Sequence, residues 1–364
     1  MKFVSKLLLR ILPKGIYAML RVVADMRDGQ KGALAGHTLS CDVARGPCTE
    51  EYGEFPAKSD WARQRMSFRE RAVFMFDEAD VFVRTGDVAV GGNLVSGCGS
   101  GIKGTIMVAP WARLFKAIAF VFCARRRIPS NRDGYVFVKA NGYYHFIMES
   151  LVQTLLALKL HPSAEVLVSS CEYKGFVREY LDLLAKNGSI RRILPVDGEL
   201  LNVPRYVVCE LEADSASVCS SSVELLRSVL CRGIPAKGGR KVFVTRKGRR
   251  AFDNQEEVEK AMSALGFEVV DTAPMGIEDE IKFFSGVSFL VANHGAGLTN
   301  MIFSPKGAKV VELFSPKWLH DVYFRLAKAC GHTYGMCVAK QKDRESDWGR
   351  IDCTELRRMV SEME

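Results

Sequence analysis

Apolar and polar positions alternate with different periods along the chain. Between about residues 70 and 110, short apolar runs separated by Gly and Asp, such as 72–76 and 80–86, predict a small β-rich segment. After residue 131 the pattern changes to apolar strands that alternate with helices. Strands are predicted at 135–140, 166–170 and 205–210, with helices at about 143–160, 174–186 and 220–231. Near-continuous apolar strands with intervening helices predict a parallel sheet covered on both faces.

A second alternation follows a stretch rich in Gly, Pro and Lys at 232–239, which we interpret as a hinge. Strands are predicted at 241–246, 267–271, 287–292 and 308–314, with helices at 254–266, 278–286 and 318–332 and a short helix after 295. The chain is therefore expected to be an α/β protein of two Rossmann-like domains that face each other across a cleft. Ligands of open α/β sheets bind at the carboxyl ends of the strands, so chemistry is expected in the loops that follow them.

The expected domain boundaries follow from these patterns. Residues 31–235 form an N-terminal domain, with its β-rich part at about 70–110 and its α/β part at about 131–231. Residues 236–364 form the C-terminal domain, whose last helix can pack back on the N-terminal domain.

Residues 1–30 form a separate basic segment, in which Lys2, Lys6, Arg10, Lys14 and Arg21 stand among Leu, Ile and Val. Arg10 and Pro13 interrupt its apolar run, and no run of the chain approaches the roughly 20 apolar residues of a membrane span. Two interpretations stay open: the segment lies as amphipathic helices on an anionic membrane surface, or it packs against the body of the protein.

Charge and cysteine content narrow the partners and the compartment. The net charge of +9 suits any anionic partner, but no helix-in-groove motif or aromatic-interleaved basic pattern indicates nucleic-acid binding. The 11 cysteines are scattered without a CxxC pair, which argues against a zinc site of that spacing and against a regular disulfide framework. A reducing cytoplasm is the simplest interpretation.

The segment VANHGAGLTN (291–300) is the first candidate for chemistry. A buried strand runs directly into His294 and Gly295, and then into a helix start at Ala296 and Gly297. Glycine allows a ligand to approach the backbone, and a helix N-terminus offers N–H groups and a positive dipole end to a phosphate. The alternative is a tight structural turn capped by His294.

The segment TRKGRRAFDN (245–254) is the second candidate, with Arg246, Arg249 and Arg250 in the loop after a strand. Guanidinium groups in this position can bind phosphate oxygens in pairs, although a solvated charged surface is the usual explanation of such a cluster. Asn254 is expected to cap the following helix, with Glu257 completing a capping box.

The segment NGYYHFIMES (141–150) is the third candidate. His145 and Glu149 are four residues apart and share a face of the predicted helix, at the rim of an apolar stripe. Such a pair can serve in acid–base catalysis or as a structural hydrogen bond.

In this order, these segments resemble glycosyltransferase family 61. The resemblance rests on VTRKGRR–NQEE, GFEVVD, NHGAGLTNMIF and KVVELF, and on an upstream YHFIMES element at 144–150. It covers roughly residues 75–360 and is strongest over 241–335. It implies a GT-B-like pair of Rossmann domains and an inverting transfer from an NDP-sugar, most often a UDP-sugar, bound by the C-terminal domain to a glycan or lipid-linked glycan acceptor on the N-terminal side.

The resemblance also implies roles for individual residues. His145 or Glu149 faces the acceptor, and one of them is the base. The donor-binding residues implied are Arg246, Arg249, Arg250, Asn254, His294, Gly295, Ala296, Gly297, Leu298, Asn300 and Glu312. Arg246 and the amides at 295–297 are expected to share a pyrophosphate pocket, and Glu312 to hydrogen-bond sugar or ribose hydroxyls. No cofactor is expected, because the acidic clusters at 77–80 and 278–280 read as a turn and a helix start rather than a metal clamp.

Without a signal or anchor, the chain is expected to be a bacterial member that makes capsule, lipopolysaccharide or exopolysaccharide at the cytoplasmic face of the inner membrane. Two alternatives remain. One is a pyruvyl or phosphosugar transferase that modifies polysaccharides on a similar scaffold, and the other is a non-catalytic nucleotide-sugar-binding scaffold protein.

Overall fold

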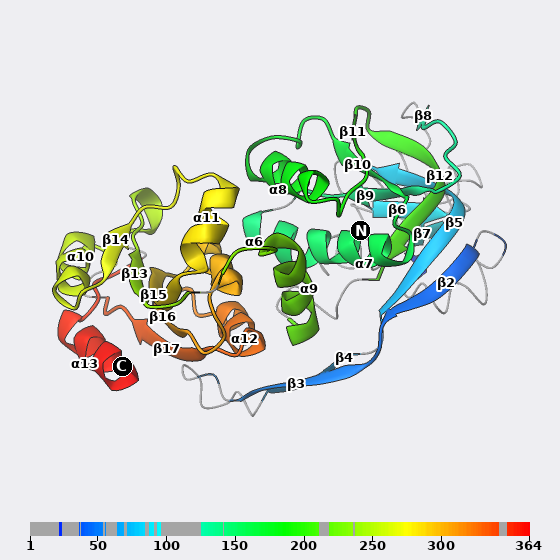
Figure 1. The fold of residues 1–364 in the computed structure, drawn as a ribbon. Coiled ribbons are helices and arrows are strands. Elements are labelled where there is room, and N and C mark those ends of the chain that lie inside the picture. Colours follow the sequence, from blue (N-terminus) through cyan, green and yellow to red (C-terminus); the bar gives the residue numbers. More distant parts are fainter. Residues whose placement is uncertain are drawn as a thin grey trace, which may run out of the picture. The chain divides into compact units, whose positions relative to one another are not determined.

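The computed structural model describes residues 22–23, 36, 38–53, 55, 64–68, 71–83, 87–90, 93–95, 125–140, 142–210, 218–235, 237–341 and 348–364. The chain divides into two compact units (Figure 1). The first comprises residues 1–47 and 69–215, and the second comprises residues 48–68 and 216–364.

The second unit is larger than the expected C-terminal domain of 236–364. It also contains residues 48–68 and the helix α9 (Ser220–Leu230), which the sequence analysis assigns to the N-terminal domain. The contacts of α9 explain the difference. Arg227 donates hydrogen bonds to the carbonyl oxygens of Ile302 and Ser304, which end the helix η4 of the second unit.

A ten-stranded mixed sheet organises the first unit, in the order β1-β7-β6-β5-β12-β9-β10-β11, with β2 on β5 and β8 on β12. Its strands are β1 (Val22–Val23), β2 (Thr38–Arg45), β5 (Arg71–Phe82), β6 (Asp87–Val90), β7 (Asn93–Val95), β8 (Arg125–Arg127), β9 (Tyr135–Val138), β10 (Glu165–Ser169), β11 (Ile193–Val196) and β12 (Leu200–Cys209). The strands β9, β10 and β11 are parallel, whereas β5 runs antiparallel to β12. The expected β-rich and α/β parts are therefore joined in one sheet.

The described helices of the first unit are those that the sequence predicts. The helix expected at 143–160 is present as α6 (Tyr143–His145), the π-helix η2 (Phe146–Leu151) and α7 (Val152–Leu160), and α8 spans Gly175–Lys186. The helix α7 is buried on nearly all sides, as its apolar sequence requires. The π-helical turn was not predicted.

Five parallel strands form the main sheet of the second unit, in the order β14-β13-β15-β16-β17. They are β13 (Arg240–Val244), β14 (Glu268–Val270), β15 (Val287–Asn293), β16 (Lys309–Phe314) and β17 (Thr333–Val338). The first four were predicted. The fifth, TYGMCV, was missed because it has few long apolar side chains. A separate hairpin of β3 (Cys48–Gly53) and β4 (Gln64–Phe68) also belongs to this unit.

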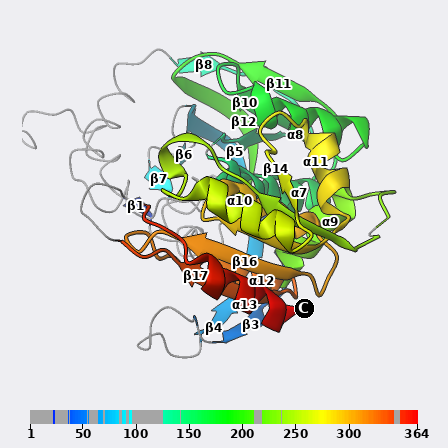
Figure 2. The ribbon, with the colours of Figure 1, turned by 90° about the vertical axis from the view of Figure 1, so that its left-hand side faces the viewer.

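Helices cover both faces of the five-stranded sheet. The helices α10 (Gln255–Ala264) and α13 (Cys353–Met363) contact each other on one face, as Figure 2 shows from the side of α10. On the other face lie α11 (Ile277–Phe284), the 3-10 helix η4 (Ala296–Phe303) and α12 (Val322–Ala329) (Figure 1). The last helix, α13, packs on α10 and β17 of its own unit, and its expected packing on the N-terminal domain stays a prediction.

The strand order locates a crevice for ligands. Numbered along the chain, the five strands follow the order 2-1-3-4-5, which is that of a doubly wound sheet. The order reverses between β13 and β15, so the connections after these two strands turn to opposite faces of the sheet. Such a switch point, at the carboxyl ends of the strands, is where doubly wound domains bind their ligands. The α/β class and the parallel sheets are confirmed, and the facing pair of Rossmann domains stays a prediction.

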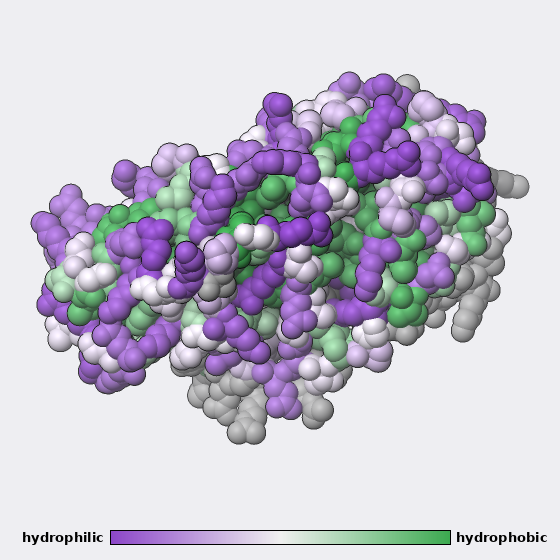
Figure 3. Space-filling view, in the orientation of Figure 1, coloured by the Kyte–Doolittle hydropathy of each residue, from purple (hydrophilic) through white to green (hydrophobic). Residues whose placement is uncertain are grey.

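The surface is mostly polar on the face shown in Figure 3, where hydrophilic residues cover most of the area. Among the described residues, no helix combines the length and the apolar character needed to cross a membrane. Apart from the short strand β1, the expected basic segment 1–30 and the apolar run 114–123 lie outside the described residues.

Candidate active site

The carboxyl end of β15 leads directly into the HGAG turn. Gly295 precedes the 3-10 helix η4, and the amide of Leu298 donates to the Gly295 carbonyl at 3.0 Å. Leu298 and Asn300 are buried, whereas Ala296 and Gly297 are partly exposed at the start of the helix. The sequence therefore predicts the turn and the helix correctly, and the backbone at 296–297 is the part that a ligand can reach.

The guanidinium of Arg246 lies against the backbone of Gly295. A β-carbon at Gly295 would stand 2.2 Å from Nη1 of Arg246 and 3.3 Å from its Cζ. The φ angle of Gly295, +157°, is also one that residues with a side chain rarely adopt. Only glycine allows this approach, and it brings together the loops after β13 and β15, at the switch point of the sheet.

Arg246 and Arg250 are neighbouring cations, and no carboxylate among the described residues pairs with either of them. Burial lowers the pKa of Arg246, the charge of Arg250 lowers it further, and Tyr323 acts in the opposite sense. Within the described part of the chain, neither guanidinium forms an ion pair, while Lys247 between them pairs with Asp271 at 3.5 Å. Two uncompensated guanidinium groups favour an anion that accepts hydrogen bonds from both.

The third arginine of the loop, Arg249, lies in the 3-10 helix η3 (Gly248–Arg250). Its side chain is not among those that the structure describes. Its role in donor binding stays a prediction.

A fully buried carboxylate holds His294, the residue before the glycine turn. Nδ1 of His294 lies 2.5 Å from Oε1 of Glu312, and the Tyr334 hydroxyl donates to Oε2 at 2.6 Å. Burial raises the pKa of Glu312, and the hydrogen bond with His294 opposes that rise. The imidazole also stacks on Phe314, with ring centroids 5.1 Å apart. Because Nδ1 is engaged, Nε2 is the ring nitrogen left for a ligand.

The expected role of Glu312 needs correction. The sequence analysis assigns it to sugar or ribose hydroxyls, but the side chain is 0% exposed and both its oxygens are already hydrogen-bonded. Glu312 instead fixes the orientation of His294.

An aromatic group beside His294 was missed by the sequence analysis. The Tyr323 ring packs edge-on against the His294 imidazole, with ring centroids 5.5 Å apart. The His320 ring stacks on the same imidazole, with ring centroids 6.3 Å apart. Trp318 of the same loop is 50% exposed. The sequence predicts a helix from 318, but α12 begins only at Val322, so Trp318 and His320 lie in a loop and Tyr323 lies in the first turn of α12. The aromatic run WLHDVYF was the available signal.

Amide side chains fasten the arginine loop to the end of β15. Asn293 donates from Nδ2 to Oε1 of Gln255 at 3.1 Å and to the carbonyl of Arg250 at 3.3 Å. Gln255 in turn donates to the Thr245 hydroxyl at 3.2 Å. These hydrogen bonds hold the loop after β13 against the carboxyl end of β15. Neither Asn293 nor Gln255 was singled out from the sequence.

The side chain of Asn254 does not form the helix cap that the sequence predicts. The residue precedes α10, but its side chain makes no capping hydrogen bond. Instead Oδ1 accepts from the amide of Ile351, and Nδ2 donates to the Ile351 carbonyl and to Glu257, at 2.9, 2.9 and 3.2 Å. Asn254 thus ties the C-terminal segment to α10. These contacts favour a structural role, and its contact with the donor stays a prediction.

His145 and Glu149 are brought together in the first unit. Nδ1 of His145 lies 2.7 Å from Oε1 of Glu149 across the turn where α6 passes into the π-helix η2. The hydrogen bond with Glu149 raises the pKa of His145, partly offset by burial. The other oxygen of Glu149, Oε2, is buried and has no hydrogen-bond partner among the residues that the structure describes. A π-helical turn with an unsatisfied carboxylate oxygen is typical of a functional site.

Comparisons with known proteins agree with this geometry. Residues 143–311, which contain both groups of site residues except Glu312, match the family model described as Glycosyltransferase 61. Two proteins of Oryza sativa subsp. japonica are similar: the beta-1,2-xylosyltransferase XAX1, 39% identical over 80 residues, and the beta-1,2-xylosyltransferase XYXT1, 33% identical over 79 residues. These stretches cover 22% and 21% of this chain, and 14% and 17% of the relatives' own length.

The match over residues 143–311 agrees with the resemblance to glycosyltransferase family 61 found in the sequence. The two relatives are plant proteins, and they give no support to the expectation of a bacterial capsule or exopolysaccharide enzyme.

Proposed function

We propose that this protein transfers a sugar from a nucleoside-diphosphate sugar to a glycan acceptor. The observation that carries the proposal is the contact between Arg246 and Gly295, because it places an uncompensated cation beside the exposed backbone at the start of η4. A diphosphate matches this arrangement: one phosphate can accept from the guanidinium groups and the other from the helix N–H groups.

In this proposal, the site promotes departure of the nucleoside diphosphate. Negative charge develops on the leaving phosphate as the glycosidic bond breaks, and Arg246, Arg250 and the N-terminus of η4 stabilise it. His294, fixed by Glu312, offers Nε2 as a further donor or acceptor on the same side. These groups stabilise the transition state more than the bound donor, as catalysis requires.

His145 and Glu149 are proposed to activate the acceptor hydroxyl. A base must be unprotonated to accept the hydroxyl proton, and the pair can share that proton through its 2.7 Å hydrogen bond. Attack from the side opposite the leaving group gives inversion at the anomeric carbon. This assignment supports the proposed inverting mechanism and is tested through the pH dependence described below.

The donor sugar is proposed to be a pentose, on the strength of the relatives alone. Both are named as beta-1,2-xylosyltransferases, so UDP-xylose is the first donor to test. A thermal-shift panel of UDP-xylose, UDP-glucose, UDP-N-acetylglucosamine, GDP-mannose and phosphoenolpyruvate is the direct experiment. Stabilisation by one nucleotide sugar, followed by its turnover with a glycan acceptor, supports the proposal.

Two other results of the thermal-shift panel would contradict the proposed sugar transfer. Stabilisation by phosphoenolpyruvate, with every nucleotide sugar left intact, indicates a pyruvyl transferase. Binding of a nucleotide sugar without transfer or hydrolysis, across a range of acceptors, indicates a non-catalytic binding protein.

Association with the cytoplasmic face of a membrane is a separate proposal that rests on sequence alone. The basic segment at residues 1–30 would bind an anionic surface through its Lys and Arg side chains. Co-sedimentation with phosphatidylglycerol vesicles, but not with phosphatidylcholine vesicles, supports it. Equal recovery with both kinds of vesicle, or with neither, contradicts it.

A further inference from the structure

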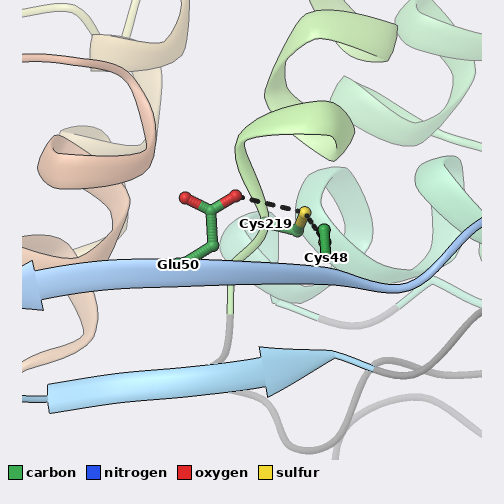
Figure 4. Close-up of side chains that lie close together, drawn as sticks. All are labelled: Cys48, Glu50 and Cys219. Atoms are coloured by element: carbon green, nitrogen blue, oxygen red, sulfur yellow. Dashed lines mark hydrogen bonds between the residues drawn. The ribbon is translucent and has the colours of Figure 1, made fainter.

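Two cysteines far apart in sequence meet in the second unit. Sγ of Cys48, at the start of β3, lies 2.9 Å from Sγ of Cys219, the residue before α9 (Figure 4). Cys219 is buried and Cys48 is half-buried. No disulfide joins these two described cysteines in this structure. The separation is closer than non-bonded sulfur atoms ordinarily come, and it exceeds the roughly 2.05 Å of a disulfide by less than an ångström.

The surrounding contacts hold the two segments in place. Oε1 of Glu50 on β3 accepts from the amide and the hydroxyl of Ser220, at 2.9 and 2.6 Å, and so caps the start of α9. Tyr52, two residues further along β3, donates its hydroxyl to the carbonyl of Val218. The two neighbours of Cys219, Val218 and Ser220, are therefore both held by β3, and the two sulfur atoms are less than an ångström from bonding distance.

A metal ion fits this group less well than a covalent bond. Cys48, Glu50 and Cys219 supply three ligand atoms within 4.8 Å of one another, whereas a structural zinc site takes four. Glu50 is also already engaged by Ser220. The described residues provide no fourth Cys, His, Asp or Glu to complete the set.

We propose that Cys48 and Cys219 form a disulfide that fastens the β3–β4 hairpin to α9. Oxidation by a small disulfide such as oxidised glutathione proceeds in two balanced steps. The half-buried Cys48 loses its proton, and its thiolate attacks the small disulfide and releases one thiolate. Cys219 then loses its proton and attacks Sγ of Cys48, which releases the second. The glutathione disulfide gains the two electrons and ends as two thiols.

The cross-link would stabilise one wall of the candidate site. The hairpin segment carries Phe55, whose ring lies 6.4 Å from Phe314 and 5.5 Å from Phe324. Phe314 in turn stacks on His294. A bond between residues 171 apart in sequence also removes much conformational freedom from the unfolded chain.

The test compares the full-length protein after oxidised glutathione and after a phosphine reductant. Each sample is denatured, alkylated with N-ethylmaleimide and weighed by mass spectrometry. Of the 11 cysteines, two fewer are alkylated in the oxidised sample, and peptide mapping finds Cys48 linked to Cys219. The oxidised protein also unfolds on the order of 5 °C higher than the reduced protein.

Variants sharpen the comparison. Cys48→Ser abolishes both the loss of two alkylation sites and the redox dependence of Tm. Cys171→Ser, which removes an exposed thiol of the first unit, leaves both unchanged. If Cys48→Ser does not fold, peptide mapping of the wild-type protein still tests the proposal.

Three results would overturn the proposal. All 11 cysteines are alkylated after oxidation, or the linked peptides join other cysteines, or the purified protein holds one zinc per chain whose removal by a chelator is needed before Cys48 and Cys219 react.

Discussion

At Gly295, the absence of a side chain decides where Arg246 lies. The guanidinium fills the space that a β-carbon would take, so the glycine and the arginine define one local structure although 49 positions separate them (295 − 246 = 49). The sequence suggested both residues separately, because each sits after a buried strand. Their contact, and the pairing of His294 with Glu312, could not be predicted, since side-chain partners depend on the order and register of the strands.

Gly295→Ala is expected to displace Arg246, because the new methyl group would stand 2.2 Å from Nη1. We expect affinity for a nucleoside diphosphate to fall by about 2 kcal/mol, roughly 30-fold, as for loss of a charge-assisted hydrogen bond. Calorimetric titration measures it. Gly46→Ala is the control, since a β-carbon there meets nothing within 4 Å and the residue lies outside the candidate site. Equal losses in the two variants would show that the contact with Arg246 is not what matters.

The His145–Glu149 pair of the first unit leads us to expect a specific pH dependence of the reaction. Its hydrogen bond with Glu149 raises the pKa of His145, so the imidazole is expected to titrate above 6.5, the ordinary value. Replacing the carboxylate in Glu149→Gln lowers that pKa. If the pair is the base, the acidic limb of kcat/KM lies above pH 6.5 in the wild type and moves down in Glu149→Gln, while kcat falls at least tenfold, by about 1.4 kcal/mol of barrier.

NMR titration of the His145 ring protons checks the pKa, and the rate profile checks the role. Glu179→Gln, on the exposed side of α8, is the control and leaves both unchanged. A normal rate profile in Glu149→Gln and in His145→Ala would place the base elsewhere.

Among the elements, η4 matters most for the site because its first residues follow the glycine turn. Its far end is held by two contacts that the sequence does not reveal. Arg227 of α9 binds its last carbonyl groups, and Nε2 of the buried His332 lies 3.0 Å from the Met301 carbonyl oxygen. Strong apolar runs predicted most strands and helices of the second unit. The hairpin β3–β4, with few apolar residues, gave too weak a pattern.

His332 should make the second unit sensitive to acid. Burial lowers its pKa to about 4, so the folded protein keeps it neutral while the unfolded chain binds a proton below pH 6.5. Between these values the unfolded state holds more protons, so the free energy of unfolding falls as the pH falls. The loss amounts to about 3 kcal/mol by pH 4.

His332→Gln, which keeps a donor for Met301, is expected to flatten this dependence. Urea unfolding of both proteins between pH 4 and 7 measures it. If the free energy of unfolding depends on pH in the same way in the variant and in the wild type, His332 is not the group that titrates.

For the whole molecule, the sequence predicted the α/β class and the doubly wound C-terminal sheet, because alternating strands and helices are local patterns. It did not predict that residues 48–68 belong to the second unit, or that the β-rich strands continue the sheet of the first. Both are long-range pairings that leave no periodicity in the chain. The candidate donor site lies within the second unit, and so its main test does not depend on how the two units are arranged.

The most direct measurement is a calorimetric titration of wild type, Arg246→Gln and Arg358→Gln with the nucleoside diphosphate of the donor that the thermal-shift panel selects. Arg358 is an exposed arginine of α13 paired with Glu362, and its variant controls for loss of charge. We expect Arg246→Gln to bind roughly 30-fold more weakly, about 2 kcal/mol, with Arg358→Gln unchanged. Equal affinity of Arg246→Gln and wild type would contradict a diphosphate site between Arg246 and the glycine turn.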